Sequence, residues 1–340
     1  MEQVIKSEQA EQEIRRGIAA RYGAASYRED GQTIFAKQAQ RVRLAPCPSA
    51  VRRNPPLSGA GRLPCMADVV RVVPYYMYGA APVADAGGVC MDTLMRAALA
   101  YQNRMRVPFA LMNTDSVMPY EQYGFHCICE RAEYRLREGT RYRVADRGSQ
   151  LALAHFVNAV LCRKYGLFAI RSARYYEKLE ERLAARGGSI CLIKENDSLK
   201  GYFTYIGPNV IGEVVMAEET ELEQYFEVIG EERPATAARI VNLPEMLRYI
   251  SSAGKVTIAI RISDPVFAQN DGLFIWYLDE SGSRMERVEE PKDASGAMRP
   301  EISVTIGELT AFFFEYIKLK QNMKFDSIYL SGPAWIHENI

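Results

Sequence analysis

A short stretch around residue 120 places a phenol where it could act as a proton donor. Asn113, Ser116, Tyr120 and the pair Gly124 and Phe125 follow the spacing N-x-x-S-x-x-x-Y-x-x-x-G-F. An unperturbed tyrosine has a pKa of about 10, so its hydroxyl carries a transferable proton at neutral pH. The alternative is that Tyr120 only packs at the end of a sheet, since the chain has 20 tyrosines. The surrounding elements bear on this choice.

Apolar spacing around Tyr120 predicts a strand, a helix and two further strands. Residues 68–78 (DVVRVVPYYMY) favour a strand, 92–105 an amphipathic helix, and 108–113 a short buried strand. Alternation through residues 125–136 predicts a long strand, which places Tyr120 in the connection between two strands. The helix residues expected to face a core are Leu94, Met95, Ala98, Leu99 and Met105.

The rest of the chain predicts two more α+β units. The second unit has two helices at 149–164 and 172–186, a hairpin at 189–206, a strand at 210–217 and a short helix at 221–229. The third unit has strands at 238–242, 255–263 and 272–280, a helix at 243–250, a loop at 280–299, and a final strand and helix with a capping box at Thr305 and Glu308. We therefore expect domains at 1–137, 138–235 and 236–340.

Residues 25–67 are expected to be irregular. From residue 31 to residue 67 there is no acidic residue, and the segment holds five prolines and several arginines. SGAGR at 58–62 could be the glycine turn of a basic arm for phosphates, but without a preceding strand and a following helix an ordinary loop is the stronger interpretation.

Composition excludes several classes of function. Lys plus Arg and Asp plus Glu each number 42, so no net charge draws the chain onto nucleic acid or an anionic membrane. The first residues are charged and no later run reaches about 18 apolar residues, which favours a soluble cytoplasmic protein. The seven cysteines are scattered except for Cys127 and Cys129, which we expect to be reduced and buried. With three dispersed histidines and no CxxC or HExxH motif, we expect no metal.

The spacing around Tyr120, in the context strand, helix, strand, resembles the GNAT superfamily of acyl-CoA N-acetyltransferases. The layout is similar to its Eis-type (enhanced intracellular survival) branch, in which a GNAT domain is followed by a second GNAT-like domain and a sterol-carrier-like C-terminal domain. The stretches that resemble this branch lie between residues 68 and 340 and are VVPYYMYG, RSARYYEKL, RIVNLPEML, the segment around Asp264 and IGELTAFFF. The resemblance implies a mixed GNAT sheet flanked by helices.

The resemblance also implies a function, namely acetyl-CoA-dependent N-acetylation of a primary amine by direct attack on the thioester. Tyr120 would be the general acid, and the Ile340 carboxylate would be the base. Asn113 would be a cofactor contact, and backbone amides would bind the pyrophosphate. These amides are those of Gly87, Gly88, Val89, Cys90 and Met91.

Two alternatives remain open at this point. The chain could be a catalytically degenerate GNAT relative that lacks CoA binding, or a small-molecule or lipid-binding protein that uses its C-terminal domain. The expected partner of an active enzyme is a small-molecule or lysine-type amine, and related proteins assemble as homo-oligomers.

Overall fold

The computed structural model describes residues 26–27, 33–36, 40–46, 49–52, 69–72, 74–78, 88–207, 210–289, 299–319, 325, 328–329 and 332–336. Its centre is a seven-stranded sheet in the order β1-β2-β3-β6-β7-β14-β8, called the central sheet below. Its strands are β1 (Ser26–Tyr27), β2 (Thr33–Ala36), β3 (Gln40–Pro46), β6 (Tyr75–Tyr78), β7 (Phe109–Asn113), β8 (His126–Leu136) and β14 (Phe226–Ile240). Neighbours are antiparallel, except that β6 and β7 are parallel.

Helix α2 (Gly88–Arg104) connects β6 to β7, as a parallel pair requires a crossover. The predicted helix is confirmed and begins at Gly88, earlier than expected. Leu94, Met95, Ala98 and Leu99 are fully buried as predicted, whereas Met105 is 48% exposed because it follows the last helical residue. The short helix α3 (Met118–Glu121) lies between β7 and β8. The predicted strands at 108–113 and 125–136 are confirmed as β7 and β8.

Strand β14 differs most from expectation. A strand was predicted at 238–242, after a short helix at 221–229, but the turn η2 (Glu219–Glu221) and helix α6 (Leu222–Tyr225) end before β14 begins at Phe226. Gly230 and Pro234 interrupt the sequence pattern, and the pairing of β14 with β8 accommodates them through irregularities between Ile229 and Arg233 and around Pro234. One strand therefore runs across residue 235, where the second domain was expected to end. The C-terminal half of this strand lies between β7 and β8 and pairs with both.

The second unit matches the sequence pattern closely. Helices α4 (Gln150–Lys164) and α5 (Ala173–Ala184) and the hairpin of β11 (Ser189–Glu195) and β12 (Ser198–Gly207) are confirmed. Asn196 and Asp197, with φ of 47° and 62°, make the tight turn of this hairpin. Strands β13 (Val210–Met216) and β9 (Arg143–Val144) complete a sheet in the order β13-β12-β11-β9.

A smaller sheet joins distant parts of the chain in the order β21-β10-β4-β5. Its strands are β4 (Ser49–Arg52), β5 (Val69–Val72), β10 (Leu167–Ala169) and β21 (Ala334–Trp335). The strand predicted at 68–78 is thus two strands in different sheets, β5 and β6, divided near Pro74, which lacks an N–H for a continuous ladder. The irregular segment expected at 25–67 contains β1 to β4, so that expectation is wrong at these strands.

The third unit is built on a sheet in the order β18-β17-β16-β19. Its elements are α7 (Leu243–Leu247), β15 (Ser251–Ser252), β16 (Val256–Ser263), β17 (Gly272–Asp279), β18 (Gly282–Arg287), β19 (Ile302–Thr305), α8 (Ile306–Phe313) and β20 (Ile328–Tyr329). The capping box of Thr305 and Glu308 is confirmed at the start of α8. Strand β18 lies in the stretch expected to be a loop, because its polar residues pair along one edge of β17.

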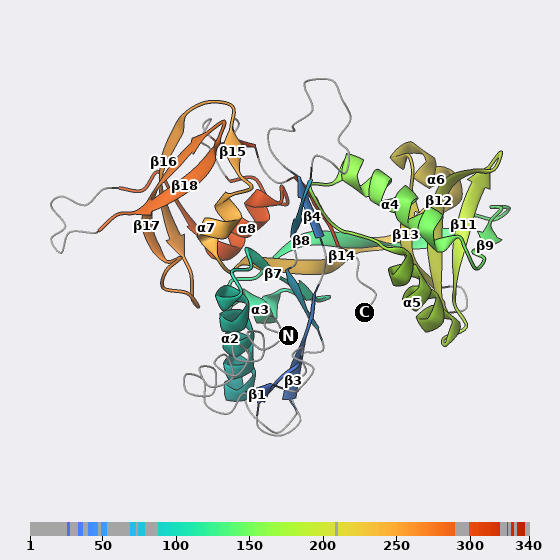
Figure 1. The fold of residues 1–340 in the computed structure, drawn as a ribbon, viewed down its shortest axis with the longest axis horizontal. Coiled ribbons are helices and arrows are strands. Elements are labelled where there is room, and N and C mark those ends of the chain that lie inside the picture. Colours follow the sequence, from blue (N-terminus) through green and yellow to red (C-terminus); the bar gives the residue numbers. More distant parts are fainter. Residues whose placement is uncertain are drawn as a thin grey trace, which may run out of the picture.

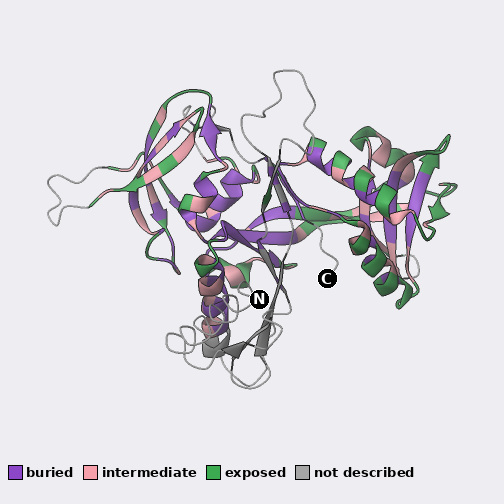
Figure 2. Cartoon of the chain, viewed as in Figure 1, coloured by how far each residue is buried: buried purple, intermediate pink, exposed green. Residues whose placement is uncertain are grey.

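The parts meet around β8 and β14, which cross the middle of the molecule (Figure 1). The second and third units lie at opposite ends of these strands, and α2 lies between the two units, below the central strands in this view (Figure 1). Buried residues gather along the C-terminal half of β14 and its neighbours, whereas the outer faces of α4 and α5 are exposed (Figure 2).

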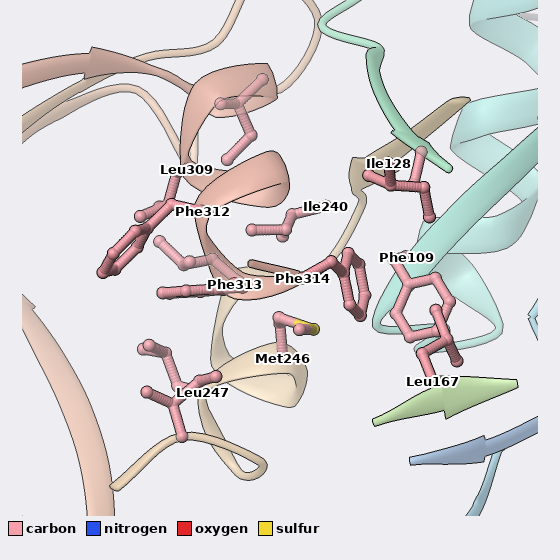
Figure 3. Packing of buried hydrophobic residues seen from close by; sticks show 14 of the residues in the cluster. Phe109, Ile128, Leu167, Ile240, Met246, Leu247, Leu309, Phe312, Phe313 and Phe314 are labelled. Atoms are coloured by element: carbon pink, nitrogen blue, oxygen red, sulfur yellow. The ribbon is translucent and has the colours of Figure 1, made fainter. Parts of the chain in front are cut away.

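The main hydrophobic cluster is shared between units. Phe109 and Ile240 of the central sheet, Leu167 of β10, and Met246 and Phe314 of the third unit belong to it (Figure 3). The rings of Phe109 and Phe314 meet edge to face, with centroids 5.2 Å apart. The third unit therefore packs directly on the central sheet.

Candidate active site

The parallel pair β6 and β7 defines the edge where a site can form. Tyr76 pairs with Leu111 and Met77 with Met112, so both strands end at the same edge of the sheet. In open α/β arrangements, ligands bind beyond the carboxyl ends of such strands. The chain leaving β6 continues to the start of α2, and the chain leaving β7 continues to α3 and Tyr120.

Tyr120 is half-buried on α3 and packs against the cluster formed by α2 and one face of the central sheet. Its N–H donates to the Val117 carbonyl at 2.8 Å, and its carbonyl accepts from the N–H of Tyr123 at 2.9 Å. Burial raises the pKa of Tyr120 above its ordinary value of 10.0. The phenol therefore keeps its proton throughout the neutral range, as a general acid must.

Asn113 is the exposed last residue of β7 and pairs with Thr236 of β14. The following loop is fixed by the Ser116 N–H, which donates to the Thr114 hydroxyl at 3.1 Å, and by the Thr114 N–H, which donates to the Ala235 carbonyl at 3.4 Å. Asn113 and Tyr120 are thus the two ends of one short connection. The cofactor contact predicted for Asn113 stays a prediction.

The N-terminal turn of α2 supplies the backbone amides that the sequence singled out. Gly87 lies outside the described residues, while Gly88, Val89, Cys90 and Met91 form the first turn, which carries no acidic residue. The first four N–H groups of a helix have no partner within the helix and favour anions.

Asp92 follows that turn, and its charge is compensated within the helix. Its carboxylate pairs with Arg96 at 2.9 Å. Burial and the Asp92 carboxylate raise the pKa of Tyr123. Tyr123, which is buried in the cluster formed with α2, therefore places the Tyr120 turn beside this helix.

Gly124 closes the turn after Tyr120 in a conformation that favours glycine, with φ of 80°. A Cβ here would lie 2.5 Å from Cγ2 of Ile306, at the start of α8. The glycine of the predicted G-F pair is therefore required both by its backbone conformation and by the close approach of the third unit.

Gly124→Ala is expected to destabilise the fold by roughly 1–3 kcal/mol or more, because both the backbone conformation and the contact with Ile306 oppose a side chain. Gly139→Ala is a matched control, since Gly139 has φ of 82° but nothing within 4 Å of its Cβ position. Urea denaturation of both variants isolates the contribution of the contact. Equal losses of unfolding free energy in the two variants would show that Ile306 moves aside without an energetic penalty.

The described part of the C-terminal segment ends at the central sheet. Ile336 is fully buried, and its carbonyl accepts a hydrogen bond from the Thr236 hydroxyl at 2.7 Å. Thr236 pairs with Asn113, the last residue of β7. Ile336, which is bonded to Thr236, therefore lies level with the end of β7 in the central sheet. Ile340, the predicted base, lies outside the described residues.

The RSARYYEKL stretch contributes a buried ion pair to the second unit. Nη2 of Arg171 lies 2.9 Å from Oε1 of Glu213, and both side chains are fully buried. Tyr202 donates its hydroxyl hydrogen to the same carboxylate, and the guanidinium lies 4.2 Å from the Tyr175 ring centroid. The guanidinium also lies 5.6 Å from the ring centroid of Trp335, so this network contacts strand β21.

Cys127 and Cys129 are both buried, as predicted. Burial raises the pKa of both thiols, that of Cys129 to about 12, which disfavours the thiolate that nucleophilic or metal chemistry needs. Among the described residues no group of three or more His, Cys, Asp and Glu side chains is placed to hold a metal ion. In the same part of the chain, no helix is long and apolar enough to cross a membrane.

The α+β arrangement of a mixed sheet with helices matches the GNAT-type fold of N-acetyltransferases. Among solved structures, Eis1 from Mycobacterium abscessus has a TM-score of 0.61 at 13% identity, covering 92% of this chain and 91% of its own. A GCN5-related N-acetyltransferase from Kribbella flavida gives 0.60 at 11% identity, covering 97% and 95%. A conserved protein of unknown function from Enterococcus faecalis, a probable N-acyltransferase, gives 0.60 at 15% identity, covering 88% and 82%.

At these identities the likeness concerns the fold alone. No protein-family model matches the chain, and no curated protein matches it.

Proposed function

We propose that the chain is an acetyl-CoA-dependent N-acetyltransferase of the Eis-type branch that acylates a primary amine by direct attack. The observation that carries the proposal is the position of Tyr120. It is a half-buried, protonated phenol beyond the carboxyl end of β7, in a turn that contacts α2 through Tyr123 and Asp92. The fold shared with N-acetyltransferases across most of the chain supports the same reaction class.

In this reaction the amine nitrogen attacks the thioester carbonyl, a C–N bond forms, and the C–S bond breaks. The departing thiolate takes its proton from the Tyr120 hydroxyl, and the proton lost by the amine returns to the phenolate through the base and solvent. The thioester sulfur becomes basic only as the C–S bond breaks, so the phenol donates at that stage. Because the pKa of Tyr120 lies above that of a typical thiol near 8.5, this transfer is uphill, and the return of the amine proton to the phenolate completes it.

The proposed cofactor cradle is the first turn of α2, from Gly88 to Met91, together with Gly87 before it in the sequence and Asn113 at the end of β7. The first turn of α2 carries no acidic side chain, and Asp92 is paired with Arg96, so its charge opposes a pyrophosphate less. These features support binding of an anionic pyrophosphate at the backbone amides.

The base assigned by the resemblance, the Ile340 carboxylate, remains a prediction. Its support is the position of Ile336 at the row where β7 ends. Ile336 belongs to the cluster on the face of the central sheet opposite Tyr120. Four residues extend by at most about 14 Å, which bounds the reach of that carboxylate.

Calorimetric titration with acetyl-CoA tests the proposal directly. We expect saturable binding, with desulfo-CoA, which keeps the pyrophosphate, also binding, and release of free thiol when a panel of primary amines is added. Absence of binding at millimolar acetyl-CoA would contradict the proposal and favour the catalytically degenerate relative. Binding of acetyl-CoA without thiol release for any amine would support the proposed cofactor site but contradict the proposed transferase activity.

A further inference from the structure

Arg239 of β14 is a fully buried cation that the proposed reaction does not use. Its Nη2 lies 2.6 Å from Oδ2 of Asp264, its Nε donates to the Ile240 carbonyl at 3.0 Å, and its Nη1 donates to the Tyr123 carbonyl. All three nitrogens of the guanidinium therefore have a partner. One of those partners is the backbone of the turn that carries Tyr120.

Asp264, from the third unit, is itself held in place on every side. Its Oδ1 accepts from the N–H groups of Val266 at 2.8 Å and Phe267 at 3.0 Å, and its Oδ2 accepts from the Asn270 side chain at 2.9 Å. The Phe267 ring lies 4.9 Å from the Arg239 guanidinium and belongs to the cluster that packs on Tyr120. The loop that follows β16 thus completes the surroundings of the Tyr120 turn.

The same loop also holds α2. Nη1 of Arg96 donates to the Pro265 carbonyl at 3.3 Å, while Arg96 pairs with Asp92, whose charge contributes to the raised pKa of Tyr123. The carbonyl of Tyr123 is therefore held by Arg239, and its phenol lies in the electrostatic field of Asp92. Arg239 is bound by Asp264, and Arg96, the partner of Asp92, is bound by Pro265. Both interactions therefore depend on adjacent residues of one loop in the third unit.

Buried ion pairs contribute little net stability compared with apolar residues of the same shape, so stability alone does not account for this arrangement. We propose that Arg239, oriented by Asp264, is a positioning residue that fixes the Tyr120 turn against helix α2, so that the third unit sets the geometry of the transfer site. This inference rests on the proposed function. It predicts that the guanidinium fork, and not merely a positive charge, is required at residue 239.

Arg239→Lys tests the inference because lysine keeps the charge opposite Asp264 and lacks the fork that reaches the Tyr123 carbonyl. We expect amide hydrogen exchange in residues 118–126 to become at least about tenfold faster. With acetyl-CoA and the best amine, kcat is expected to fall about 10- to 100-fold while KM for acetyl-CoA stays within about twofold. Asp264→Glu, which keeps both charges and displaces the guanidinium, should change both measurements in the same direction.

Trp276→Phe is the control, because Trp276 is buried in the main hydrophobic cluster, whereas the Tyr120 turn packs in the separate cluster formed with α2. It should leave exchange at 118–126 and kcat unchanged even if it lowers the melting temperature. Unchanged exchange in Arg239→Lys, or faster exchange with unchanged kcat, would overturn the inference. If the unmodified protein shows no thiol release, the proposed function fails, and the exchange comparison still reports separately whether Arg239 holds the turn.

Discussion

Tyr120→Phe is expected to lower kcat by a factor of about 10²–10⁴ while leaving the Kd for acetyl-CoA nearly unchanged. The substitution removes the proton donor and keeps the ring that packs against the cluster of α2 and the central sheet. Stopped-flow detection of thiol release gives kcat, and calorimetry gives Kd. Tyr101→Phe is the matched control, since Tyr101 packs against the same cluster and lies on α2.

The pH dependence adds a second measurement on the same residue. A general acid acts in its protonated form, so its contribution is present at low pH and is lost as pH rises through its pKa. Burial raises the pKa of Tyr120 above 10.0, so the loss caused by Tyr120 should occur only above pH 10. A Tyr120-dependent decline in kcat at lower pH, or equal activity of Tyr120→Phe and the unmodified protein, would remove Tyr120 from the mechanism.

Arg171→Met is expected to cause the largest loss of stability, about 3–5 kcal/mol, because it leaves the Glu213 carboxylate buried without its cation. For a chain of this size, the melting temperature should fall by roughly 5–15 °C. Differential scanning calorimetry measures both quantities.

The double variant Arg171→Met with Glu213→Gln separates the charge from the packing. Glutamine keeps an acceptor for the Tyr202 hydroxyl but carries no charge, so the double variant should be more stable than the single one. A double variant as unstable as Arg171→Met would show that the shape and stacking of Arg171 on Tyr175, rather than its charge, stabilise this core.

Local patterns predicted the elements whose neighbours are close in sequence. The helices α2, α4 and α5, the hairpin of β11 and β12, and the capping box at Thr305 follow from periodicity and turn chemistry. The patterns failed where pairing with a distant strand decides the structure. Strand β14 passes Gly230 and Pro234 by irregular pairing with β8, and β18 is polar because it pairs at a sheet edge.

The candidate site was predicted in part for the same reason. Tyr120, Asn113 and the start of α2 lie in one continuous stretch, so their spacing could be read directly. Arg239 and Asp264 were missed as partners of the Tyr120 turn because the contact joins residues 116 positions apart in the chain. Asp264 was singled out only by resemblance, and an arginine within an apolar strand was the one local signal for Arg239.

Strand β14 has a consequence for how the chain is made. Residues 1–137 alone would leave the facing edges of β7 and β8 without their shared neighbour, exposing unpaired backbone groups. During synthesis the central sheet stays open until residue 240 has left the ribosome, after the α4 and α5 region has already emerged. The central sheet, at whose edge we propose the reaction takes place, is thus completed late, and fragments that end before β14 should aggregate rather than fold.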